Sequence, residues 1–84
     1  MEQKYQSKKE LFNKVLPALR TKKHELHRAG ISFVKETDIW NYHVEYNWRG
    51  AVGLTIASMV NHILNTENKV YEKYVVDKLE KKRG

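Results

Sequence analysis

Residues 8–29 read KKELFNKVLPALRTKKHELHRA, and this stretch decides the fold of the chain. Its large apolar residues are spaced so that they share one side of an α-helix: Phe12, Val15, Leu16, Leu19 and Leu26. Ser7 and Glu10 match a capping box at its start, and Gly30 follows it, where glycine commonly ends a helix. The sequence therefore predicts one long amphipathic helix here.

Pro17 lies inside this predicted helix. Its nitrogen has no hydrogen to donate to the carbonyl of Asn13, so the helix should kink there, or a second segment should begin there. On a helical wheel Pro17 lies opposite the apolar side, so a bend at this point would wrap the apolar side around a core.

Three shorter helices follow in the prediction. They cover about residues 36–46, 55–65 and 67–81, and Thr66 is the predicted N-cap of the last one. The segment from Asn47 to Gly53 contains two glycines and is predicted to be a loop. Strand signals are absent apart from a short apolar connector after the first helix.

The predicted fold class is all-α, a single small domain of about four helices. It spans residues 1–84, with an ordered core over about residues 7–80. A chain this short buries only about 60–65% of its unfolded surface, so the core is thin and a homodimer could bury one face. The predicted core collects apolar residues from all four helices: Phe12, Leu16, Leu19, Leu26, Trp40, Val60, Ile63, Leu64, Tyr71 and Val75.

The composition argues against several classes of protein. The chain has no cysteine, which excludes disulfides, Cys-based zinc sites and thiol nucleophiles. No apolar run approaches the ~20 residues that a membrane span needs, and residues 1–9 lack the apolar region of a signal peptide. We therefore expect a soluble cytoplasmic domain.

The histidines form no metal or catalytic motif. His24 and His27 are three residues apart, whereas a zinc-protease helix needs His-Glu-x-x-His and a third ligand. His43 and His62 have no carboxylate pattern that would make either a general base. Since phosphate-binding and nucleophile motifs are also missing, the sequence predicts no enzyme activity, no metal and no cofactor.

Charge is distributed unevenly along the chain. Residues 1–35 carry nine Lys or Arg and three Asp or Glu, residues 36–68 carry one and four, and residues 69–84 carry six and three. The net charge of +6 therefore comes from a basic first part and a basic tail around an acidic middle. Such a distribution steers a protein toward polyanions or acidic protein surfaces.

The basic strip of the first helix lies beside its apolar side and consists of Arg20, His24, His27 and Arg28, at i, i+4, i+7 and i+8. Lys23 falls within the apolar stripe, so its stem should cover the edge of the core while its amine reaches water. Two interpretations are open: a solvated surface, or a contact for a phosphate backbone or an acidic partner.

Two tryptophans lie in the acidic middle of the chain. Trp40 is on the apolar side of the second predicted helix and is expected in the core. Trp48 precedes Arg49 in the predicted loop, where it could cap the core or act as a stacking platform for a base. The candidate RNA- or partner-binding residues are Arg20, Lys23, His24, His27, Arg28, Trp48 and Arg49.

Two nucleic-acid motifs are rejected. Residues 50–53 have the Gly-x-x-Gly spacing of a KH loop, but basic residues between the glycines and flanking strands are missing. The third predicted helix contains no Lys or Arg, so as a recognition helix it would present the wrong charge to DNA. We therefore do not expect DNA to be a partner.

Short motifs along the chain resemble a known family. They are VLPAL at residues 15–19, IWNY at 39–42, Trp48, and VNHIL at 60–64. In this order and spacing, over about residues 10–75, they resemble the small bacterial post-transcriptional regulator family that includes the competence regulator ComN. The resemblance implies control of messenger RNA level or translation, a cytoplasmic location and recruitment by other proteins.

The chain departs from the family pattern at three places. His43 stands where an aliphatic residue is expected, His62 where an acid is expected, and residues 50–53 where a more basic loop is expected. The last departure moves the expected RNA contact to the first helix.

The sequence therefore predicts a non-enzymatic post-transcriptional regulator that acts on mRNA, directly through the basic strip or within a protein complex. The alternative is a protein–protein adaptor that does not touch RNA. It would use the basic first helix against an acidic partner, or the C-terminal amphipathic helix through Tyr71, Tyr74 and Leu79.

Overall fold

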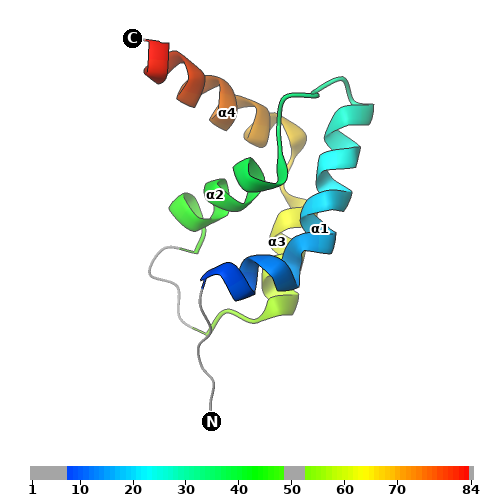
Figure 1. The fold of residues 1–84 in the computed structure, drawn as a ribbon. Helices are drawn as coiled ribbons and strands as arrows, with labels where there is room; N and C mark the ends of the chain where they lie inside the picture. The colour runs from blue at the N-terminus through cyan, green and yellow to red at the C-terminus, as the bar shows by residue number, and fades with distance from the viewer. Residues whose placement is uncertain (1–7, 49–52, 84) are drawn as a thin grey trace.

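A computed structural model of the chain describes residues 8–48 and 53–83. These residues form four α-helices (Figure 1): α1 (Lys8–Arg28), α2 (Glu36–Tyr46), α3 (Ile56–Asn65) and α4 (Asn68–Arg83). No strand occurs in the part of the chain that is described. The predicted all-α fold is confirmed, and every helix has nearly the bounds that the apolar periodicity predicts. None of these helices is both long enough and apolar enough to cross a membrane.

The helix α1 bends near its proline. Figure 1 shows its first turns, in dark blue, running in a different direction from the rest of the helix. Pro17 is exposed, whereas Ala18 and Leu19 beside it are buried, so the bend turns the apolar side of α1 toward the core. Thr21 Oγ1 also donates to the carbonyl of Pro17 at 3.0 Å, and such bonds favour bending.

Local capping sets the ends of the helices. Gly30 has φ of +89°, and the amides of Gly30 and Ile31 donate to the carbonyls of His27 and Leu26, which is a Schellman end for α1. The first turn of α3 is capped by Thr55 Oγ1, which accepts from the amide of Ser58 at 3.0 Å.

The predicted cap of α4 was wrong. Thr66 is the C-cap of α3, and its hydroxyl donates to the carbonyl of His62 at 2.6 Å. Only Thr66 and Glu67 separate the two helices, so the hydroxyl is within reach of the last turn of α3. The amide of Val70 donates to the carbonyl of Glu67, so that α4 begins one residue later than the cap prediction requires.

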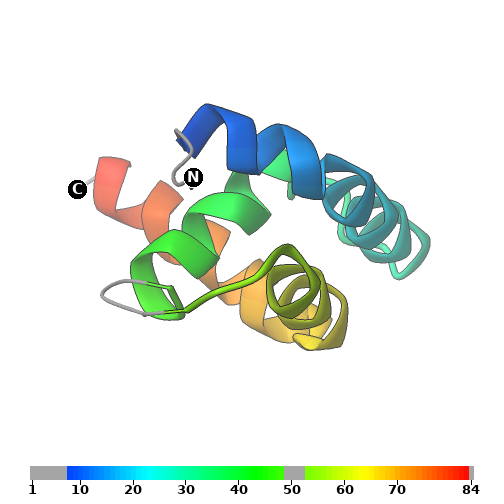
Figure 2. The same ribbon diagram turned by 90° about the horizontal axis from the view of Figure 1, so that it is seen from below.

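The four helices pack unequally. The helix α1 contacts both α3 and α2, whereas α4 packs chiefly on α2. Figures 1 and 2 show α2 and α4 side by side and the C-terminal end of α4 projecting away from the other helices.

The core agrees with the prediction in most positions. Six predicted core residues are buried: Leu19, Leu26, Trp40, Ile63, Tyr71 and Val75. Phe12, Leu16 and Val60 are partly buried against them. Leu64 is exposed, because Met59 and Ile63 are the α3 residues whose side chains face the core. The prediction missed two buried polar residues, Lys22 and His43.

Candidate functional site

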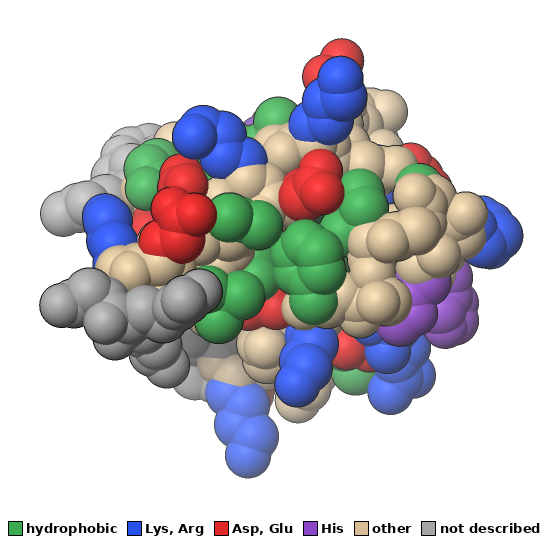
Figure 3. Space-filling view, turned by 90° about the horizontal axis from the view of Figure 1, so that it is seen from above, with side chains coloured by type: hydrophobic (Ala, Val, Ile, Leu, Met, Phe, Trp, Pro, Cys, Tyr) green, Lys and Arg blue, Asp and Glu red, His purple; other side chains and the backbone are tan. Residues whose placement is uncertain are grey.

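The basic strip of α1 lies on the surface. Arg20, His24, His27 and Arg28 are all exposed. They lie on the side of α1 that faces away from the core, and not directly beside the apolar side as the sequence predicts. Figure 3 shows histidine side chains gathered at one edge of the molecule, with Lys or Arg side chains on both sides of them. The structure therefore brings these four predicted residues together on one accessible face.

Lys23 does not add free charge to this face. Its stem is half-buried at the core edge, as predicted, but Nζ lies 3.0 Å from Glu36 Oε2 at the start of α2. The hydrogen bond from Lys23 is the main reason that the pKa of Glu36 is lowered, and the charge of Arg20 acts in the same direction. The net positive charge of the strip therefore comes from the two arginines, with the histidines beside them.

Trp48 caps the core and is not a stacking platform. Its side chain is buried, and Nε1 donates to His62 Nδ1 at 2.8 Å. The indole stacks on the ring of His43 at 4.8 Å between centroids and packs edge-on against Trp40 at 5.4 Å. With one ring face on His43 and 9% of the residue exposed, the indole offers little surface to a base. Arg49 lies outside the described residues.

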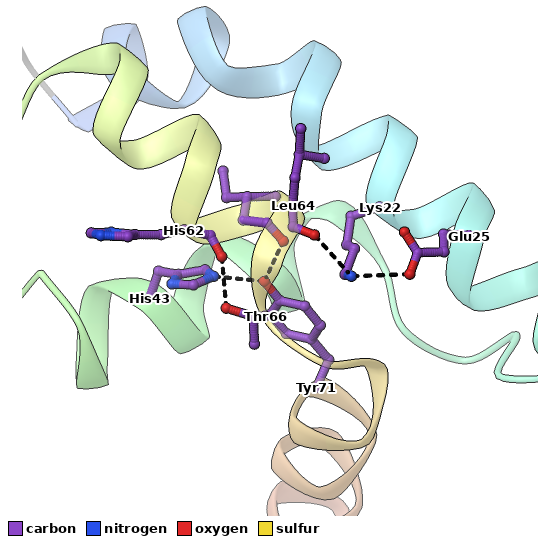
Figure 4. Close-up of polar contacts among 8 residues, drawn as sticks. Lys22, Glu25, His43, His62, Leu64, Thr66 and Tyr71 are labelled. Atoms are coloured by element: carbon purple, nitrogen blue, oxygen red, sulfur yellow. Dashed lines mark hydrogen bonds and ion pairs between the residues drawn. The ribbon is translucent and has the colours of Figure 1, made fainter.

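Lys22 forms an unpredicted polar contact between α1 and the end of α3. The side chain is 3% exposed, and Nζ lies 3.1 Å from Glu25 Oε2 and 3.4 Å from the carbonyl of Leu64 (Figure 4). It also lies 5.9 Å from the centroid of the Tyr71 ring. A cation at the C-terminal end of a helix satisfies its last carbonyls and suits its dipole.

His43 forms the second part of this polar cluster. Its Nε2 lies 2.6 Å from Tyr71 Oη, which donates to the carbonyl of Ile63 at 3.0 Å (Figure 4). The phenol oxygen must then accept from His43 Nε2–H, while His43 Nδ1 accepts from Asn47 Nδ2 at 2.7 Å. Every polar atom of the imidazole is used, and the ring is neutral.

Burial shifts both ionisable groups away from neutral pH. Burial, with a smaller contribution from the charge of His62, lowers the pKa of His43 to about 4. Burial raises the pKa of Tyr71. Both groups keep their charge state near pH 7, and their hydrogen bonds join α2, α3 and α4. No set of three or more metal-ligating side chains lies together in the described residues.

A groove between α2 and α4 is the other notable surface. Tyr42, Tyr46 and Tyr74 form its floor, and charged residues of α4 form its rim. Glu45 accepts from Tyr74 Oη at 3.1 Å and from Lys78 Nζ at 2.9 Å, which fastens α4 to α2. In the predicted adaptor stripe, Tyr71 and Tyr74 are buried and only Leu79 is exposed, because these tyrosines pack on α2. The exposed aromatic residue of this surface, Tyr46, was not predicted.

The chain matches the model of a protein family. The match covers residues 8–83, and the family is described as post-transcriptional regulator. That span includes all four helices, the basic strip and the α2–α4 groove. A search of the curated proteins and a search of the solved structures gave no significant match. The family resemblance carried by the sequence motifs is confirmed, and the chain belongs to the post-transcriptional regulator family.

Proposed function

We propose that this protein is a non-enzymatic regulator that binds messenger RNA through the exposed basic strip of α1. Membership of a post-transcriptional regulator family supports a role in controlling mRNA. The observation that carries the proposal is the placement of Arg20, His24, His27 and Arg28 on one accessible side of one helix. Neither arginine forms an ion pair with another described residue, so both guanidinium groups are free to bind phosphate.

The strength of this contact follows from the number of free cations. Two arginine–phosphate contacts should give a slope of log K against log salt of about −1.4, at ~0.7 per contact with a single strand. Lys23 is left out of this count because it is paired with Glu36. The contact is therefore modest.

The test is a charge reversal on the strip. Arg20→Glu with Arg28→Glu should abolish retention of a labelled single-stranded RNA, because the strip would then repel phosphate. A matched control, Lys14→Glu with Lys69→Glu, makes the same change in net charge at two other exposed positions and should retain the RNA. Fluorescence anisotropy at several salt concentrations gives both the affinity and the slope.

Two results would contradict the proposal. Equal loss in both double variants would show that the RNA responds to net charge alone. Failure of the unaltered protein to bind RNA, together with co-purification of a protein, would favour the adaptor alternative.

A further inference from the structure

The α2–α4 groove has an aromatic floor that solvent reaches. The ring centroids of Tyr42 and Tyr46 are 5.3 Å apart, and those of Tyr46 and Tyr74 are 6.0 Å apart. Tyr46 is nevertheless 65% exposed. Tyrosines in such clusters are characteristic of protein interfaces, where they supply large contact area at small entropic cost.

The rim that α4 contributes carries alternating charges. Lys73, Asp77 and Lys81 follow one another at four-residue steps and all line the groove, so the rim is positive, negative and positive over about 12 Å. Lys73 and Asp77 form only an exposed ion pair, at 3.4 Å. Ion pairs of this kind contribute little to stability, so an incoming group can replace this one at small cost.

The charges of the groove argue against a nucleic acid as its ligand. The lining includes three lysines and three acids, Glu45, Asp77 and Glu80, so the groove has no net charge. A phosphate backbone lying in it would meet these carboxylates. The strip on α1, whose two arginines form no ion pair with a described residue, suits a polyanion better.

A small molecule also fits the groove poorly. Small-molecule sites commonly cover about 70–90% of their ligand. Here most of the charged lining residues are exposed, and the buried part of the floor is a single side chain, Tyr74. The groove is instead an elongated surface along about three turns of α4, which is the shape that accepts a helix.

We propose that the α2–α4 groove docks an amphipathic α-helix of a protein partner. The apolar side of that helix covers Tyr42, Tyr46 and Tyr74, which supplies the affinity. Its adjoining edge carries an acid, a base and an acid at four-residue steps, opposite Lys73, Asp77 and Lys81. The charge pattern reads the same in both directions, so it sets the register of the partner helix and not its orientation.

A second copy of this chain is a poorer occupant than such a helix. Two α4 helices packed groove to groove and antiparallel about Asp77 would place Lys73 opposite Lys81 and Asp77 opposite Asp77. Like charges at these distances are unfavourable. The docking proposal does not depend on RNA binding by the strip, which lies on another helix.

Two synthetic helical peptides test the proposal with the full-length protein. Both carry leucines on one side; the first has Glu, Lys and Glu at four-residue steps beside them, and the second has Lys, Glu and Lys. Charges on the far side of each peptide make the two net charges equal. We expect the first peptide to bind and Tyr46→Ala to weaken its binding by about tenfold or more, as for a central interface aromatic.

A charge swap in the protein makes the test sharper. The triple variant Lys73→Glu, Asp77→Lys and Lys81→Glu should prefer the second peptide over the first. All three positions are exposed, so the swap should leave the thermal unfolding transition unchanged. It should also leave RNA retention by the α1 strip intact, which separates this proposal from the proposed function.

Four outcomes would overturn the docking proposal. They are failure of both peptides to bind, binding that is insensitive to Tyr46→Ala, and displacement of the peptide by a single-stranded RNA. The fourth is a dimer in sedimentation that Tyr46→Ala converts to a monomer, which would make a second copy the occupant.

Discussion

At the scale of single residues, the polar cluster depends on a neutral His43. Its Nε2 hydrogen is used by Tyr71 Oη, and its Nδ1 accepts from Asn47. A second proton would have to go onto Nδ1, where it would face the amide group of Asn47 and place a charge among aromatic rings. Burial is accordingly the main cause of the lowered pKa of His43, about 4.

Acid should therefore destabilise the protein through His43. An unfolded histidine has a pKa of about 6.5, so the unfolded chain takes up this proton first as the pH falls. The contribution of His43 is fully present above pH 6.5, and the free energy of unfolding should drop by roughly 2–3 kcal/mol on the way to pH 4.5. Urea titrations between pH 7.5 and 4.5 measure this change.

The variant His43→Leu is the control for this prediction. It removes the buried imidazole, so its stability should lose this part of the pH dependence and keep the part that comes from carboxylates. Identical pH dependence in the two proteins would show that His43 is not the group responsible.

The sequence analysis correctly placed the stem of Lys23 at the edge of the core, but it did not predict that Lys22 is buried. Lys22 continues the spacing of Val15, Leu19 and Leu26, at steps of four, three and four residues, so it lies within the apolar stripe, as Lys23 does. Lys22 is covered because the end of α3, with the carbonyl of Leu64, and Tyr71 of α4 reach it. The periodicity of α1 therefore indicates that position 22 faces the core, but the groups that satisfy its charge depend on tertiary packing. The i, i+3 spacing of Lys22 and Glu25 is a second sequence signal, which permits their ion pair.

At the scale of elements, the helices were predictable because their signals are local. The apolar period sets their extent, and Gly30 and Thr55 set two of their ends. The prediction for Thr66 was wrong because a threonine between two close helices can form a hydrogen bond with either helix. Its hydroxyl donates to a carbonyl of α3, because only two residues connect α3 to α4. The sequence did not predict the length of that connection to within one residue.

The contact between α1 and α3 should be sensitive to charge at position 22. Lys22→Glu would place a second carboxylate beside Glu25 and against the carbonyl end of α3, inside the core. We expect a loss of about 3 kcal/mol or more in the free energy of unfolding, as for a buried charge without a partner. Urea denaturation measures the loss. The same change at exposed Lys14 should have little effect, and equal losses at both positions would contradict a special role for Lys22.

At the scale of the whole molecule, the protein has two surfaces of different character. The strip on α1 is basic, and the groove between α2 and α4 is aromatic with balanced charges. The strip was predictable because one helix carries it. The groove was not, because its floor combines side chains from two helices and its exposure depends on how α4 projects from α2. We propose RNA as the ligand of the first surface and a protein helix as the ligand of the second.

Mapping the RNA contact by NMR tests the central claim most directly. The ¹⁵N-labelled protein would be titrated with a single-stranded RNA, and the amide and arginine side-chain signals followed. Our account predicts that the largest shifts fall within residues 20–28 of α1, and that they vanish in the Arg20→Glu, Arg28→Glu variant. Shifts centred on the α2–α4 groove, or none at all, would contradict it.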